Sequence, residues 1–87
     1  MRSQYNETLK TIIHIHLLQA RETRELTQAA MAELLMMDVR SYVELDHEKS
    51  LCGTLTLVLF LIYCCLDPVA VLQEIRVSFD GLRDSFA

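Results

Sequence analysis

The sequence predicts an all-α fold of five helices in a single domain. Its 87 residues include only two Gly, one Pro and no Trp, which counts against a loop-rich or all-β protein. Helix-favouring Leu, Ala, Met, Glu and Gln dominate the composition. Apolar residues also recur at intervals of three and four, the spacing that places them on one face of a helix. The apolar share of 52% is enough for one compact core.

The first helix is expected to follow a polar lead-in over residues 1–8. Its charged end, from Arg21 to Glu25, is expected to face solvent. The positions between them repeat at helical spacing and predict one buried face. That face comprises Leu9, Ile12, Ile13, His16, Leu17 and Ala20.

Residues 26–50 predict two short amphipathic helices joined by a tight turn. Thr27 can cap the first and Asp38 the second, because each side-chain oxygen can accept a free N–H of the first helical turn. Two helices this short, joined by so few residues, have to cross steeply, which is the geometry of a helix-turn-helix. Met37 is expected to pack in the turn. The predicted core positions of the pair are Met31, Leu34, Leu35, Tyr42 and Leu45.

The uncharged run over residues 54–66 predicts a fourth helix, buried at the centre of the fold because it is apolar nearly all round. It is too short for a membrane span, which needs about 20 apolar residues. Gly53 can precede this helix, and Asp67 can cap a fifth that begins with Pro68. The predicted apolar stripe of the fifth helix is Val69, Leu72, Ile75, Phe79, Leu82 and Phe86.

Over residues 9–75 the order and spacing of these segments resemble the phage-repressor-like (Cro/cI-type, XRE) helix-turn-helix family. The resemblance rests on several linked positions along the chain: Leu26-Thr27-Gln28, Met31-Ala32-Glu33, Met37-Asp38, Tyr42 with Leu45, Asp46-His47-Glu48-Lys49, and Asp67-Pro68. It implies a five-helix lambda-repressor-like DNA-binding domain with the helix-turn-helix at helices 2 and 3. Residues 76–87 would then be a C-terminal extension of the domain.

The chain departs from the family pattern at three helix ends. Glu25, Met36 and Glu48 stand where the family usually has Gly, which tolerates the positive φ common at such ends. Either these residues adopt that conformation, at about 1 kcal/mol each, or the turns differ slightly. Ala30 also removes the usual acidic member of a capping box after Thr27.

The resemblance implies a transcriptional regulator that binds double-stranded DNA, with helix 3 (about Val39 to Asp46) in the major groove. The three cysteines, an odd number with two of them adjacent, are expected to be reduced thiols in the cytoplasm. Arg40 could pair with guanine or clamp a phosphate, and Gln28 could bond a phosphate. A net charge of −4 and an acidic run of Glu44, Asp46 and Glu48 favour the alternative, a helix-turn-helix scaffold that binds other proteins instead. The implied DNA-facing residues are Gln28, Val39, Arg40, Ser41, Val43, Glu44 and Lys49.

No catalytic, metal or cofactor site is predicted. The carboxylates are scattered along the sequence, and His14 and His16 point to different sides of a helix. The thiols lack the spacing of metal ligands, and we expect them to be reduced and largely buried. No small-molecule ligand and no membrane association is expected. Two roles stay open for the C-terminal aromatic and aliphatic residues, packing on the first helix or a homodimer interface. The residues concerned are Phe79, Leu82 and Phe86.

Overall fold

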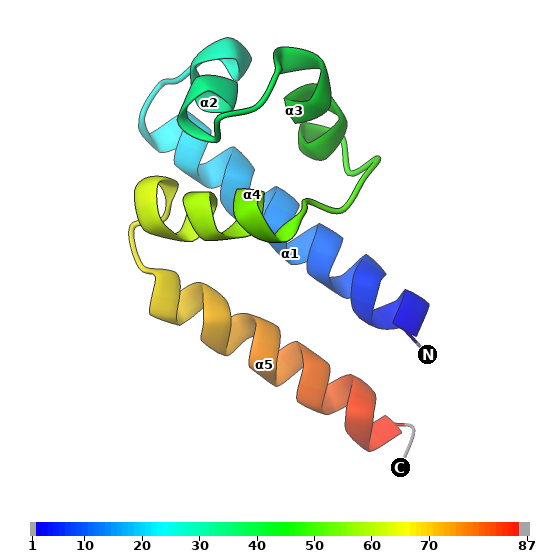
Figure 1. Ribbon diagram of the computed structural model, residues 1–87. Helices are drawn as coiled ribbons and strands as arrows, with labels where there is room; N and C mark the ends of the chain where they lie inside the picture. Colours follow the sequence, from blue (N-terminus) through cyan, green and yellow to red (C-terminus); the bar gives the residue numbers. More distant parts are fainter. Residues whose placement is uncertain (1, 86–87) are drawn as a thin grey trace.

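The computed structural model describes residues 2–85, and all regular structure within that range is helical (Figure 1). The prediction of an all-α fold with five helices is confirmed. The fourth helix continues directly into a π-helical turn, η1. The elements are α1 (Arg2–Thr23), α2 (Gln28–Leu34), α3 (Val39–Asp46), α4 (Thr54–Leu59), η1 (Phe60–Cys64) and α5 (Pro68–Ser85).

Helix α1 is the longest element and connects the two ends of the molecule (Figure 1). It contacts α3, η1 and α5, while α2 and α3 pack on one another. Figure 1 shows α2 and α3 together at one end, with α5 at the other and α4 between them. The core lies where α1, α2, α3 and η1 meet. Its buried residues are Ile13, Leu17, Met31, Ala32, Leu35, Tyr42, Leu45, Phe60 and Cys64.

Three helices begin at the side-chain caps that the sequence predicts. Thr27, Asp38 and Asp67 each accept a hydrogen bond from the backbone N–H three residues later, at 3.1, 2.7 and 3.1 Å. Each bond satisfies a donor that the first helical turn leaves without a partner, worth about 1 kcal/mol per cap. Gly53 precedes α4, also as predicted, without a side-chain bond.

Three helix ends adopt the positive φ that non-glycine residues tolerate poorly. The sequence had left open whether they do so or whether the turns differ. Glu25, Met36 and Glu48 have φ values of 55°, 54° and 57°, the left-handed region that glycine tolerates best. At each end the next residue's N–H donates to the carbonyl five positions earlier, at 2.9, 3.0 and 2.9 Å, which is the Schellman arrangement. Leu26 and Met37, two of those next residues, also pack against the core. This packing helps to hold the strained residues in place.

Two predictions about individual helices are wrong. Residues 2–8 are not a lead-in, because α1 begins at Arg2. The apolar run is not a central buried helix either, since α4 buries no residue and η1 buries only Phe60 and Cys64. Within residues 2–85 the outward side of α4 and η1 stays in solvent, and Leu55 and Ile62 are 69% and 63% exposed. No helix in the described range is long and apolar enough to cross a membrane.

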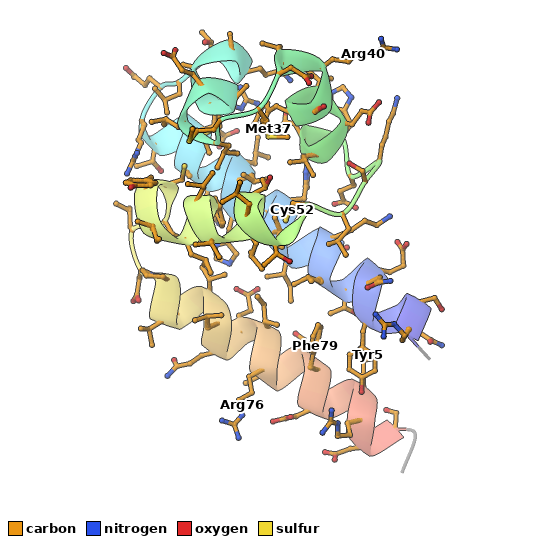
Figure 2. All side chains as sticks on the ribbon, in the orientation of Figure 1. Tyr5, Met37, Arg40, Cys52, Arg76 and Phe79 are labelled. Carbon is orange, nitrogen blue, oxygen red and sulfur yellow. The ribbon has the colours of Figure 1, made fainter. Side chains whose placement is uncertain are left out.

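Helix α5 packs on α1 through Val71 and through part of the predicted stripe, of which Ile75, Phe79 and Leu82 are half-buried. Val71 is its buried residue, whereas Val69 and Leu72 are 60% and 51% exposed. Further along, the rings of Phe79 and Tyr5 meet edge to face, with centroids 4.9 Å apart (Figure 2). The helix runs unbroken through Gly81 and across the expected domain boundary at residues 75 and 76.

Of the two roles left open for the C-terminal residues, the structure favours packing on the first helix. Phe79 contacts Tyr5, and Leu82 lines a shallow cavity together with Gln4 and Thr8 of α1. The third residue of that prediction, Phe86, lies outside the described residues. Phe79 therefore contacts α1 of its own chain, and the homodimer interface stays a prediction.

Candidate nucleic-acid interface

Helix α3 has one side in the core and the other in solvent. Tyr42 and Leu45 are buried, as predicted, and Asp46 is buried beside them. Val39 and Arg40 lie on the exposed side, and Figure 2 shows the Arg40 side chain extending away from the neighbouring helices. A residue spacing of three or four explains the division, because it gathers residues 42, 45 and 46 on one side. The helix is thus held by its inner face, and its outer face is accessible.

Asp46 joins α3 to α1 and α2 through a buried cluster of hydrogen bonds. Its Oδ2 accepts from Nε2 of Gln28 at 3.0 Å and from Nη2 of Arg21 at 3.4 Å. Its Oδ1 accepts from the hydroxyl of Tyr42 at 3.5 Å. A carboxylate that is only 6% exposed needs such partners, because an unpaired buried charge is strongly destabilising. This cluster sets the position of α3 relative to the two helices before it.

The cluster changes the role expected for Gln28 and the chemistry of Tyr42. The Gln28 amide donates to Asp46, so that side chain supports the fold, whereas a phosphate contact was expected. Burial, and next the nearby Asp46 carboxylate, raise the pKa of Tyr42 to about 12. Tyr42 therefore stays a neutral hydrogen-bond donor at all physiological pH values.

The N-terminus of α3 already holds a negative charge. The Asp38 carboxylate accepts from the Ser41 N–H at 2.7 Å and from the Ser41 hydroxyl at 3.1 Å. These bonds, the backbone one foremost, lower the pKa of Asp38 below its ordinary value. An ionised Asp38 suits the positive end of the helix, but it also repels a phosphate there. The hydroxyl of Ser41, one of the implied DNA-facing residues, donates within the chain.

The acidic residues that weigh against DNA binding, Glu44, Asp46 and Glu48, do not lie together on one surface. Asp46 is buried, and Glu48 lies 3.8 Å from the Nε2 atom of His14 on α1. Only Glu44 of the three belongs to the exposed side of α3 itself. Lys49 follows the helix and is exposed. The outer face therefore carries cationic and anionic groups together.

The remaining predicted contact residues stay accessible to different degrees. Val39 is 45% exposed, Arg40, Glu44 and Lys49 are exposed, and Val43 is half-buried. These five residues lie on α3 or directly after it. We call them the outer face of α3: Val39, Arg40, Val43, Glu44 and Lys49.

Sequence reasoning missed the structural role of Arg21 and Asp46. Arg21 was expected at the solvated end of the first helix, but its side chain is only 24% exposed and contacts Asp46. Its Nε atom is buried without a hydrogen-bond partner. One signal in the sequence was available: Asp46 falls four residues after Tyr42, and therefore on the core side of α3.

A separate cavity of about 460 Å³ lies between α1, η1 and the start of α5. Cys64 and Cys65 both line it, and burial raises the pKa of each thiol above its ordinary value, so both stay protonated and weakly nucleophilic. His16 at its edge is bonded to Glu74 of α5 at 2.6 Å. Within residues 2–85 no three His, Cys, Asp or Glu side chains gather closely enough to hold a metal ion. The cavity has no residue of α3 in its lining.

Comparisons with known proteins do not assign a family. No family profile, curated protein or solved structure matches this chain. The outer face of α3 and the exposed apolar surface of α4 and α5 are the two features that any function has to explain.

Proposed function

We propose that this protein is a transcriptional regulator that binds double-stranded DNA, with α2 and α3 as a helix-turn-helix and α3 in the major groove. One observation carries the proposal: α3 is fixed by three buried residues on its inner side, while Val39, Arg40 and Glu44 on its outer side face solvent. A helix held in this way can enter a groove about 12 Å wide without rearrangement of the fold. The short connection between α2 and α3, over residues 35–38, is also typical of a helix-turn-helix.

Four of the five residues of the outer face have a specific task under this proposal. Arg40 pairs with the O6 and N7 atoms of a guanine, or clamps a phosphate. Val39 contacts a thymine methyl group, and Glu44 accepts from a cytosine amine. Lys49 reaches the sugar-phosphate backbone and holds the register of the helix in the groove.

A second function is favoured by the charge of the molecule. The net charge is −4, and the side chains of Gln28 and Ser41 are used within the chain and not for phosphate contacts. Both observations weaken phosphate binding, which supplies most of the affinity of ordinary DNA-binding proteins. The alternative is a helix-turn-helix scaffold that no longer binds DNA and instead presents a surface to other proteins.

Duplex binding at several salt concentrations separates the two functions. We expect wild-type protein to bind a fluorescent duplex of random sequence at about 50 mM salt, and the affinity to fall steeply by about 200 mM, because bound phosphates release counterions. Arg40→Ala should weaken binding at every salt concentration. If Arg40 contacts a phosphate, the slope of log affinity against log salt should also fall by about one.

Arg83→Ala is the matched control. It removes the same charge from an exposed site on the last turn of α5, at the end of the molecule away from α3 (Figure 1). We expect its duplex affinity to equal that of the wild type. If the two arginine variants lose affinity equally, binding depends on net charge alone. Absence of any duplex binding at low salt would establish the protein-binding scaffold.

A further inference from the structure

The cavity beside α5 forms where three segments of the chain meet. Between η1 and α5 the chain reverses direction, so that residues 65–67 and the start of α5 lie against the second half of α1 (Figure 1). Ala20 of α1 and Ala70 of α5 both line the space between the segments. Each has only a methyl group as its side chain, so the two helices do not fill this space. The result is a cavity of about 460 Å³ that is partly open to solvent.

The size and the wall of the cavity suit a small organic molecule. Ligand pockets in proteins have volumes of about 300–1,000 Å³ and a mainly apolar wall with a few polar groups. Here the two alanines, Leu66 and Val71 supply apolar surface. The thiols of Cys64 and Cys65 add uncharged surface, because burial keeps both protonated. The polar groups of the wall are few, so they determine which ligand fits.

The charges at the cavity favour a cation. Of the described residues that line it, His16 and Asp67 are ionisable besides the thiols, and none is Lys or Arg. His16 is bonded to the Glu74 carboxylate, so this pair and Asp67 together carry a net negative charge whether or not His16 is protonated. Burial raises the pKa of Cys64 and the charge of Arg24 offsets part of that rise, but Arg24 does not line the cavity. An anionic ligand would therefore meet carboxylates and no cationic partner in the wall.

Asp67 is the group placed to bind a cation. Its Oδ1 accepts from the Ala70 N–H at 3.1 Å, and this capping bond holds the carboxylate at the cavity. A carboxylate can accept about four hydrogen bonds, so most of its capacity stays available to a ligand. The Asp67 charge also reaches the cavity wall, because it adds to the effects of burial and of Cys64 in raising the pKa of Cys65.

We propose that this cavity binds a small organic amine, whose ammonium group pairs with Asp67 while its apolar body lies between α1 and α5 against Ala20 and Ala70. An ammonium group has three N–H donors. The side-chain oxygens of Gln19 and Thr23, which also line the cavity, are acceptors for those that Asp67 does not take. No small-molecule ligand was expected from the sequence, because the lining combines residues 16–23 with residues 64–71, which are distant along the chain.

Titration of the full chain at neutral pH with three probes that share one apolar body tests the site. Benzylamine carries a positive charge, benzyl alcohol none and benzoate a negative one. In two-dimensional NMR spectra we expect benzylamine to shift the amide signals of Cys65 and Ala70 in a saturable way. Benzyl alcohol should bind more weakly, and benzoate should cause no saturable shift. Absence of a saturable shift with benzylamine, or equal affinity for all three probes, would overturn the proposal.

Two variants test the charge and the space separately. Asp67→Asn removes the charge but keeps the cap of α5, because Asn caps a helix about as well as Asp. Its affinity for benzylamine should fall about two- to fivefold, the range of a partly exposed ion pair. Ala70→Leu places a larger side chain in the cavity and should abolish saturable binding of benzylamine. Wild-type affinity in Asp67→Asn would overturn the ammonium contact, and wild-type affinity in Ala70→Leu would overturn the location of the site.

Asp84→Asn and Ala29→Leu are the matched controls for these variants. Asp84 is an exposed carboxylate near the end of α5, and Ala29 is an exposed alanine of α2. Neither residue lines the cavity, so both variants should bind benzylamine with wild-type affinity. An equal loss in Asp67→Asn and Asp84→Asn would mean that binding depends on net charge alone, which would overturn the site. Circular dichroism confirms that each variant is folded.

The amine site does not depend on the proposed function, because the cavity has no residue of α3 in its lining. Arg40→Ala should bind benzylamine like the wild type, and Ala70→Leu should bind random duplex like the wild type. If DNA binding fails, wild-type protein binds no duplex and still shows the benzylamine shifts. If the amine site fails, duplex binding persists without those shifts.

Discussion

The two halves of this molecule use apolar residues in opposite ways. In the half built from α1, α2 and α3, Met31, Leu35 and Tyr42 are at most 1% exposed. In the half built from α4, η1 and α5, the most apolar segment of the chain leaves Leu55 and Ile62 largely in solvent. The difference lies in the number of neighbours, because α1, α2, α3 and η1 surround a common core whereas α4 and α5 each pack on one side only. An apolar pattern in the sequence thus shows which residues can be buried. Whether they are buried depends on which other helices pack against them.

The same two halves also differ in their helix ends. The three helices of the first half end at non-glycine residues with positive φ, stabilised by Schellman hydrogen bonds. The two glycines of the chain stand in the second half, at Gly53 and Gly81, where φ is not positive. Local strain is therefore concentrated in the half that has the packing to hold it.

The largest expected effect contrasts two neighbouring residues of η1. Phe60→Ala should lower the free energy of unfolding by about 3–5 kcal/mol, because Phe60 is 1% exposed and its loss leaves a cavity in the core. Ile62→Ala, two residues later and 63% exposed, should change it by less than about 0.5 kcal/mol. Urea unfolding of the two variants measures both changes. Similar losses in the two variants would contradict the division between inside and outside.

The next largest effect concerns the buried carboxylate of Asp46 in the half built from α1, α2 and α3. Asp46→Ala should cost about 2–3 kcal/mol of unfolding free energy, because it leaves Arg21 and Gln28 without their acceptor in a mostly buried site. Asp84→Ala, an exposed carboxylate on α5, serves as the control and should stay within about 0.5 kcal/mol. Equal stability of the two variants in urea unfolding would mean that the cluster around Asp46 does not hold α3.

A pH dependence follows from the raised pKa of Tyr42. Between pH 10 and about 12 the tyrosine ionises in the unfolded chain but stays neutral in the folded one, so the free energy of unfolding should fall across this interval. Below pH 10 both states hold the proton and Tyr42 adds no slope. Tyr42→Phe should show a shallower fall over the same interval. Thermal unfolding of both proteins from about pH 9 to 12 measures the difference, and identical slopes would contradict the burial of this phenol.

The smallest expected effects come from introducing a glycine in the first half and replacing one in the second. Met36→Gly should stabilise the protein by about 0.5–1 kcal/mol by relieving the positive φ of 54°, while Met36→Ala, which keeps that strain, should bring no such gain. Gly81→Ala in the interior of α5 should add a similar amount, since a Cβ there meets nothing within 4 Å. Thermal unfolding of the three variants would resolve these shifts. A loss at Met36→Gly would indicate that its side chain packs in the native state.

Local signals in the sequence predicted much of this fold. Thr27, Asp38 and Asp67 were identified as caps because capping depends on a few adjacent residues, and each makes the predicted bond. The positive φ at Glu25, Met36 and Glu48 was one of two forms that the family resemblance left open. The core positions Tyr42 and Leu45 of α3 were predicted from their spacing, and both are buried.

Features that depend on distant partners could not be predicted in the same way. Arg21 and Asp46 are 25 residues apart, and no local pattern indicates that they meet. The burial of the run over residues 54–66 was overestimated, because composition does not reveal whether a second layer of helices exists to cover it. Phe79 had two possible roles for the same reason, and the position of Tyr5, which the sequence does not give, shows that its ring contacts α1.

Selection of bound duplexes from a random pool tests the central claim most directly, namely that α3 is a fixed helix whose outer face enters DNA. We expect enrichment of a short sequence read by α3, and loss of that enrichment with Arg40→Ala. A pool that stays random after repeated selection at low salt would contradict the proposed function.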